Sequence, residues 1–167
     1  MEGKIWLESD PEIGTTFYFT LPYEKIRESS ASSKDDSSGI HERNWEGRSV
    51  LIVEDDYINY KLLEGILKRC HARVLFAVNG KEAVRICLGP DEPDLVLMDI
   101  QLPEMNGLEA MRQIRKTKPD LPIIVQTANV LNDEKKRAEE EGCQGFIVKP
   151  VNLKYFMDEV GKILDKA

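Results

Sequence analysis

Three acids, a threonine and a lysine stand directly after short apolar runs, and their types suit phosphoryl chemistry. Glu54 and Asp55 follow one run and Asp99 another, and Thr127 and Lys149 end two more. Crowded carboxylates either raise their pKa values or bind a cation, and hard oxygen ligands suit Mg²⁺. A lysine supplies a point charge for a phosphoryl oxygen. Because a carboxylate can act as a nucleophile, the set is typical of a phosphoryl group carried on an aspartate.

These residues need a scaffold in which apolar strands alternate with amphipathic helices. Five such alternations occur between residues 48 and 167, which predicts right-handed crossovers and a doubly wound, flavodoxin-like α/β fold with five helices and a parallel sheet in the order 2-1-3-4-5. The predicted strands are Val50–Val53, Val74–Ala77, Leu95–Met98, Ile123–Gln126 and Gly145–Val148. The predicted helices are Tyr57–Cys70, Lys81–Leu88, Leu108–Lys116, Asn132–Glu141 and Leu153–Asp165.

The carboxyl ends of the strands form the edge where such sheets bind ligands. The first, third, fourth and fifth predicted strands are neighbours, so their polar ends should converge. Each residue alone has an ordinary explanation: Asp56 suits a helix N-cap, and a threonine is a common strand residue. The coincidence of four strand ends in one crevice is what favours the chemical interpretation.

Composition excludes several classes of function. The chain has 167 residues, is 41% hydrophobic and carries a net charge of −7. No apolar run is long enough for a membrane span, the start lacks a secretory signal, and the acidic balance disfavours nucleic-acid binding. The three cysteines, Cys70, Cys87 and Cys143, lack the spacing of a disulfide framework or a zinc site, and are expected to be small buried residues in a reducing compartment.

The chain is expected to have three zones. Residues 1–23 contain a β-hairpin over 4–22 with apolar residues on both faces, as at the edge of a larger structure. Residues 24–47 form a flexible serine-rich linker, with Trp45 docking where it ends. Residues 48–167 form the domain.

Four blocks of this domain carry a family resemblance. They are Leu51–Asn59, Val96–Gly107, Ile123–Asn129 and Gly145–Pro150. In order and spacing they resemble the receiver domain of two-component response regulators. The stretch Met-Asp-x-x-Leu-Pro-x-Met-x-Gly is the most specific of the matching motifs.

The resemblance implies a role for each matching residue. Asp99 resembles the phosphoacceptor, and Glu54 and Asp55 the acidic pair that binds Mg²⁺ (or Mn²⁺) together with Asp99 and the backbone carbonyl of Gln101. Thr127 resembles the switch hydroxyl. Lys149 resembles the phosphate-binding lysine.

Phe146 occupies the family's aromatic switch position, which implies a conformational change on the face of the fourth helix, fifth strand and fifth helix. The peptide bond between Lys149 and Pro150 is expected to be cis. The implied partner is a histidine kinase domain carrying phosphohistidine, or a histidine phosphotransfer protein. Alone, the chain is expected to accept phosphate rather than turn over a substrate.

Residues 3–22 resemble the last hairpin of a histidine-kinase ATP-binding domain. Hairpin, linker and receiver follow one another in this order in hybrid histidine kinases. We therefore expect the C-terminal part of such a kinase, in the cytoplasm, without the remainder of its ATP site.

Three alternatives stay open at this point. A Mg²⁺-dependent phosphatase resembling haloacid dehalogenases would carry a second aspartate where Gln101 stands. A receiver-like binding module that never accepts phosphate would lack the aspartate or the lysine. A flavin mononucleotide binder would need a hydroxyl- and glycine-rich loop after the first strand.

Overall fold

The computed structural model describes residues 3–10, 14–20, 43–128 and 132–166, and the chain divides into two units. In the first, β1 (Ile5–Asp10) and β2 (Gly14–Phe19) pair antiparallel. Trp6 stacks on Tyr18 with 5.4 Å between ring centroids. The predicted hairpin is confirmed, while its turn at residues 11–13 lies outside the described residues.

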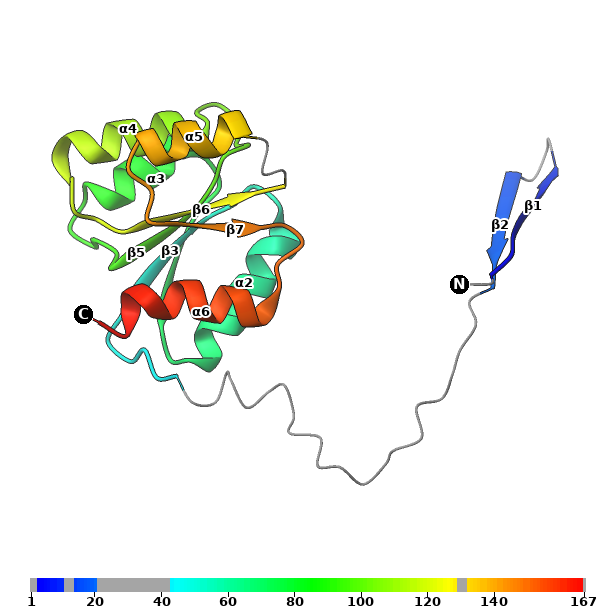
Figure 1. The fold of residues 1–167 in the computed structure, drawn as a ribbon, viewed down its shortest axis with the longest axis horizontal. Coiled ribbons are helices and arrows are strands. Elements are labelled where there is room, and N and C mark those ends of the chain that lie inside the picture. Colours follow the sequence, from blue (N-terminus) through cyan, green and yellow to red (C-terminus); the bar gives the residue numbers. More distant parts are fainter. Residues whose placement is uncertain (1–2, 11–13, 21–42, 129–131, 167) are drawn as a thin grey trace, which may run out of the picture. The chain divides into compact units, whose positions relative to one another are not determined.

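The second unit contains a five-stranded parallel sheet in the order β4-β3-β5-β6-β7 (Figure 1). This is the predicted order 2-1-3-4-5, and the crossover between β4 and β5 places the first and third strands of this unit side by side at the centre. The strands are β3 (Ser49–Val53), β4 (Arg73–Ala77), β5 (Leu95–Asp99), β6 (Ile123–Thr127) and β7 (Gly145–Val148).

Helices cover both faces of the sheet, which explains why its strands are apolar along their length (Figure 1). One face packs against α2 (Tyr57–Arg69) and α6 (Leu153–Leu164). The other packs against α3 (Gly80–Cys87), α4 (Gly107–Thr117) and α5 (Asn132–Glu140). All five predicted helices are confirmed, with ends that shift by one residue at most.

Side chains along each strand point alternately to the two faces of the sheet, so the sheet separates two apolar cores. Val50 and Ile52 of β3 belong to the core under α2 and α6, whereas Leu51 and Val53 belong to the core under α3, α4 and α5. The spacing of four apolar residues along α2 predicts a stripe that faces the core, made of Leu62, Leu63, Ile66 and Leu67. Leu62 is instead 51% exposed, because the stripe is wider than the surface that α2 buries.

The segment before β3 packs against the domain rather than continuing the linker. Trp45 is 2% exposed in the core under α2 and α6. Its backbone N–H donates to the Cys70 carbonyl at 2.7 Å, and its indole Nε1–H donates to Asp165 Oδ1 at 2.8 Å. The expected docking of Trp45 is confirmed, and packed structure reaches back to residue 43. The rest of the predicted linker, up to residue 42, lies outside the described residues.

A glycine on α6 makes room for this segment. Arg43 pairs with Asp165 and, at 3.5 Å, with Asp158. A Cβ at Gly161 would lie 1.5 Å from Arg43 Nη1. A side chain at position 161 would therefore displace the guanidinium from this point over α6.

The helices that follow the strands begin with polar caps. Asp56, predicted as an N-cap, accepts from the backbone N–H groups of Ile58 and Asn59 at 2.8 and 2.9 Å. Asparagine caps α3, α4 and α6 in the same way. Each cap fixes where the chain leaves the carboxyl edge of the sheet.

Burial raises the pKa values of the cysteine thiols. Cys70 and Cys87 are buried and Cys143 is half-buried. Burial raises the pKa of Cys87 to about 12 and that of Cys143 to about 11. Within the described ranges, no helix is long and apolar enough to cross a membrane.

Candidate functional site

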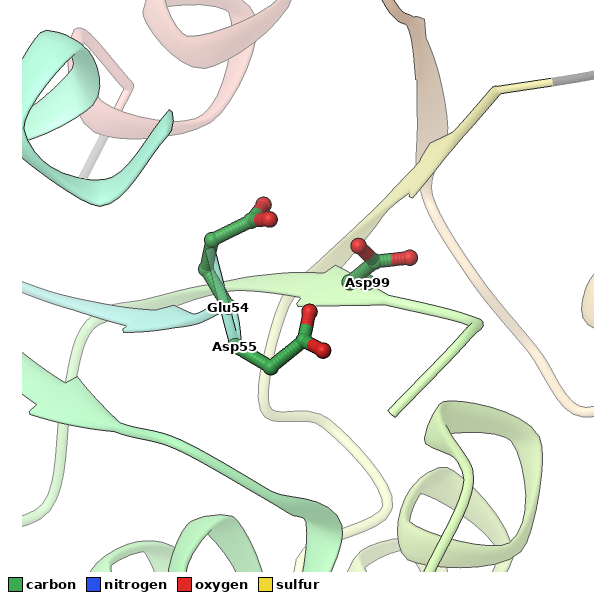
Figure 2. A group of neighbouring side chains, drawn as sticks. All are labelled: Glu54, Asp55 and Asp99. Atoms are coloured by element: carbon green, nitrogen blue, oxygen red, sulfur yellow. The ribbon is translucent and has the colours of Figure 1, made fainter. Parts of the chain in front are cut away.

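Three carboxylates meet at the carboxyl ends of β3 and β5 (Figure 2). One oxygen from each of Glu54, Asp55 and Asp99 lies within 4.8 Å of the other two. Glu54 is 1% exposed and Asp99 6% exposed, whereas Asp55 faces solvent. The predicted acidic group therefore assembles, with one member accessible from outside.

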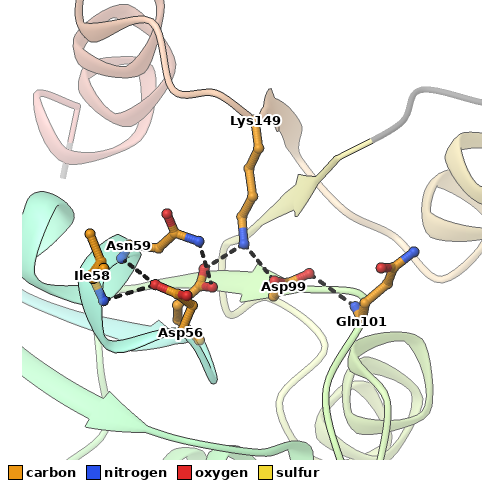
Figure 3. Close-up of polar contacts among 7 residues, drawn as sticks. Asp56, Ile58, Asn59, Asp99, Gln101 and Lys149 are labelled. Carbon is orange, nitrogen blue, oxygen red and sulfur yellow. Dashed lines mark hydrogen bonds and ion pairs between the residues drawn. The ribbon is translucent and has the colours of Figure 1, made fainter. Parts of the chain in front are cut away.

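Lys149 lies between two of these acids (Figure 3). Its Nζ is 2.6 Å from Glu54 Oε2 and 2.5 Å from Asp99 Oδ2. Burial opposes the charge on the ammonium, but the hydrogen bonds to Asp99 and Glu54 outweigh it and raise the pKa of Lys149 above its ordinary value. A positive charge is thus held beside the Asp99 carboxylate.

The remaining oxygens of the two buried acids are also engaged (Figure 3). The Gln101 N–H donates to Asp99 Oδ1 at 2.9 Å, and Asn59 Nδ2 donates to Glu54 Oε1 at 3.1 Å. Sequence reasoning placed Gln101 near the metal through its carbonyl and missed Asn59. The signal for Asn59 was available, because it lies in the first turn of the helix that Asp56 caps.

The structure places the other predicted residues along β6 and β7. Thr127 is 5% exposed at the end of β6, and its carbonyl accepts the Lys149 backbone N–H at 2.9 Å. The peptide bond from Lys149 to Pro150 is cis, as expected. Phe146 is half-buried on β7, with Lys135 Nζ 5.5 Å from its ring centroid.

Two glycines allow the loop after β5 to pack closely against the site, because they carry no side chain. A Cβ at Gly107 would lie 2.0 Å from the Asp99 carbonyl oxygen, and one at Gly80 would lie 2.5 Å from the Met105 carbonyl oxygen. The Gly80 N–H donates to that Met105 oxygen at 3.1 Å. Larger residues at either position would push this loop away from Asp99.

Glu104 holds the tip of the same loop. Its φ of 62° is a left-handed conformation that is uncommon outside glycine. The carboxylate accepts from Asn79 Nδ2 at 3.1 Å and from Lys81 Nζ at 3.0 Å. These contacts tie the loop to the start of α3.

The donor set fits a hard divalent cation. Three carboxylates face one ammonium, which leaves negative charge to be balanced. Carboxylate oxygens are the ligands that Mg²⁺ prefers, and the exposure of Asp55 leaves room for the waters that Mg²⁺ retains. Glu54, Asp55 and Asp99 are the residues that would hold it.

Comparison with known proteins identifies the family. The model of the response regulator receiver domain matches residues 50–160. The chain belongs to this receiver family. The receiver domain of the sensor histidine kinase PA1611 from Pseudomonas aeruginosa PAO1, solved with a magnesium ion in its active-site cleft, is 28% identical with a TM-score of 0.66. That match covers 71% of this chain and 98% of the solved one.

Two further matches place the receiver in two-component signalling. "Probable histidine kinase 4" of Oryza sativa subsp. japonica is 32% identical over 169 residues, covering 83% of this chain. This chain covers only 17% of that kinase's length. The Saccharomyces cerevisiae receiver domain of Ssk1, solved in complex with the histidine phosphotransfer protein Ypd1, is 32% identical with a TM-score of 0.65, covering 70% of this chain and 88% of that one.

Proposed function

We propose that the receiver accepts a phosphoryl group on Asp99 from a phosphohistidine of a partner protein. The observation that carries this proposal is the meeting of Asp99 with Glu54, Asp55 and Lys149 at one edge of the sheet. Positioning and charge neutralisation are most of what phosphoryl transfer requires.

The proposed step forms one bond and breaks one. A carboxylate oxygen of Asp99 attacks phosphorus in line, which forms an acyl phosphate and breaks the bond from phosphorus to the imidazole nitrogen. The electron pair of the broken bond stays on that nitrogen. Because the other ring nitrogen of the reacting phosphohistidine carries a proton, the ring leaves as neutral imidazole. No redox partner is needed.

Residues of this chain stabilise the charge that the step brings in. Lys149, held beside Asp99, supplies a positive charge to the phosphoryl oxygens, and the Thr127 hydroxyl donates a hydrogen bond. Glu54, Asp55 and Asp99 would bind Mg²⁺, with the Gln101 carbonyl as a further ligand and Mn²⁺ as an alternative ion; the ion would neutralise phosphoryl charge.

The proposed switch rests on the match of Thr127 and Phe146 to the family's switch positions. The phosphoryl group draws Thr127 inward, and Phe146 turns into the space behind it. The face made by α5, β7 and α6 then changes its surface. Two exposed apolar side chains already lie on this face, Val148 at 42% and Tyr155 at 46% exposure, and are available to a downstream partner.

The phosphodonor is expected to dock beside the acceptor on the start of α2. Three apolar side chains are exposed there, namely Tyr57 at 65%, Ile58 at 78% and Leu62 at 51%. The first two are separated from Asp55 of the site by the N-cap residue Asp56 alone. An apolar patch of this kind suits a helical domain that carries phosphohistidine. The Ypd1 complex of a related receiver supports a partner of this class.

We also propose that the chain is the C-terminal part of a hybrid histidine kinase in the cytoplasm. Residues 1–23 would be the kinase hairpin, 24–47 the linker and 48–167 the receiver. The match to the rice kinase covers more of the chain than the receiver alone occupies. Side chains on both faces of the hairpin are exposed, such as Trp6 at 46% on one face and Phe17 at 65% on the other, as expected where a larger sheet continues.

The test is phosphorylation with a small donor. Acetyl phosphate and Mg²⁺ should add one phosphate to the wild-type chain and none to Asp99→Asn. Asp91→Asn is the matched control, because Asp91 pairs with Arg73 on the surface away from the site. Equal labelling of Asp99→Asn would overturn the proposal, and turnover of p-nitrophenyl phosphate would favour the phosphatase alternative.

A further inference from the structure

One buried side chain beside the site has no role in the chemistry above. Gln126 is the last residue before Thr127 on β6, and its side chain is 0% exposed. The register places it opposite Asp99 on β5, and its carbonyl accepts the Ile100 N–H at 3.3 Å. Gln126 is therefore fixed next to the phosphoacceptor by the backbone itself.

The amide of Gln126 is not satisfied. Among the residues that the structure describes, neither its Nε2 nor its Oε1 has a hydrogen-bond partner. A buried amide without partners loses its hydration and gains nothing in return, so it destabilises the state in which it occurs. Such a group in a native structure requires a physical explanation.

The pattern of β6 makes this position more unusual. Alternation along the strand puts Gln126 on the same face as Ile124, and the register pairs it with Ile147 on β7. Both isoleucines belong to the apolar core under α2 and α6. An apolar side chain would suit position 126, and glutamine stands there instead.

The polar residues of the site lie on the same face of the sheet as Gln126. Glu54, Asp99 and Lys149 are spaced along β3, β5 and β7 so that alternation brings them to this face, and their side chains contact one another. In this state Lys149 holds Asp99 Oδ2 at 2.5 Å. Lys149 is the side chain that donates a hydrogen bond to this oxygen.

We propose that Gln126 is a positioning residue whose amide becomes hydrogen-bonded when Asp99 carries a phosphoryl group. Lys149 turns to the phosphoryl oxygens, which removes its N–H from Asp99. The neighbouring Gln126 Nε2–H then donates to the acyl carbonyl oxygen of Asp99. This inference rests on the proposed function and adds a residue to it.

The consequence is thermodynamic. The unpartnered amide raises the free energy of the unphosphorylated state, and its new bond lowers that of the phosphorylated state. Gln126 therefore shifts the equilibrium toward phosphorylation while it weakens the resting fold. Removing the amide should reverse both effects, a combination that a purely structural residue does not produce.

The test uses Gln126→Met, which keeps the length of the side chain and removes its polar atoms. With beryllofluoride and Mg²⁺ as the phosphoryl mimic, the variant should bind about tenfold more weakly in calorimetric titration. Without them it should unfold at a higher temperature than wild type. Ile124→Val is the matched control, because it changes the same face and strand and should leave beryllofluoride affinity unchanged.

Affinity equal to wild type in Gln126→Met would overturn the proposal. Gln126→Leu serves as the second variant if the methionine variant does not fold. Failure of wild type itself to bind beryllofluoride would overturn the proposed function and this inference with it. Weak binding by the variant alone supports both.

A spectroscopic measurement addresses the hydrogen bond directly. The side-chain amide signals of Gln126 can be assigned in ¹H–¹⁵N spectra by their loss in Gln126→Met. Beryllofluoride should move one amide proton downfield and slow its exchange with solvent. Signals that do not respond would contradict the proposed bond.

Discussion

Replacing Trp45 with alanine should strongly destabilise the receiver, although the residue lies before its first strand. The indole is 2% exposed and packs in the core with α2 and α6. Loss of a buried tryptophan side chain costs about 3–5 kcal/mol through lost burial and the cavity left behind. A domain of this size has only about 5–15 kcal/mol of total stability.

The hydrogen bond to Asp165 contributes a smaller part. The Asp165 side chain is 46% exposed, so solvent can replace the indole donor. Trp45→Phe keeps most of the apolar ring and should cost about 1–2 kcal/mol. The two variants together separate packing from hydrogen bonding.

Thermal unfolding followed by far-ultraviolet circular dichroism is the assay, because it does not depend on tryptophan emission. Trp45→Ala should lower Tm by about 10–20 °C. Trp6→Ala is the matched control, since Trp6 is 46% exposed on the hairpin. A Tm for Trp45→Ala within about 2 °C of wild type would refute the packing argument.

Further predictions concern charge, thiols and metal. Hydrogen bonds from Lys61 and Lys68 lower the pKa of Glu64 from 4.5 to about 2, so its stabilising effect is complete above pH 4.5 and disappears as pH falls through 2. In urea unfolding, Glu64→Gln should be less stable than wild type at pH 7, with a deficit that shrinks on acidification; a constant deficit would contradict this. Because burial raises the pKa of Cys87 to about 12, this thiol should resist iodoacetamide at pH 8 until urea is added, as mass spectrometry would show; rapid labelling of the native protein would disprove its burial. Asp55→Asn should weaken Mg²⁺ binding about 10–100-fold in calorimetry, because Asp55 is one of the three acids that would hold the ion. The Tm should change little, because Asp55 is exposed. Unchanged Mg²⁺ affinity would show that Asp55 is not a ligand.

Periodicity predicted most of the fold because both faces of the sheet are covered. Apolar strands and amphipathic helices left one consistent topology, and strand order then placed Glu54 and Asp99 side by side. The same reasoning predicted too much burial for Leu62, because a helical stripe does not reveal how wide its contact surface is.

Contacts made by segments distant in sequence were not predictable from local patterns. Gly161 in the sequence predicts a weak position in a helix, and the packing of Arg43 over this glycine becomes visible only in the structure. The left-handed turn at Glu104 depends on donors from another segment, Asn79 and Lys81. The burial of Gln126 without partners follows from packing, and composition gives no signal of it.

The ion pair between Arg43 and Asp165 joins the first described residue of the receiver unit to the end of its last helix. The chain enters the domain at residue 43 and completes α6 at residue 164, and these two points are joined at the edge where the strands begin. The carboxylates lie at the opposite edge, where the strands end (Figures 1 and 2). The described segment that enters the receiver at residue 43 therefore lies at the opposite edge of the sheet from Asp99 and does not cover the carboxylates.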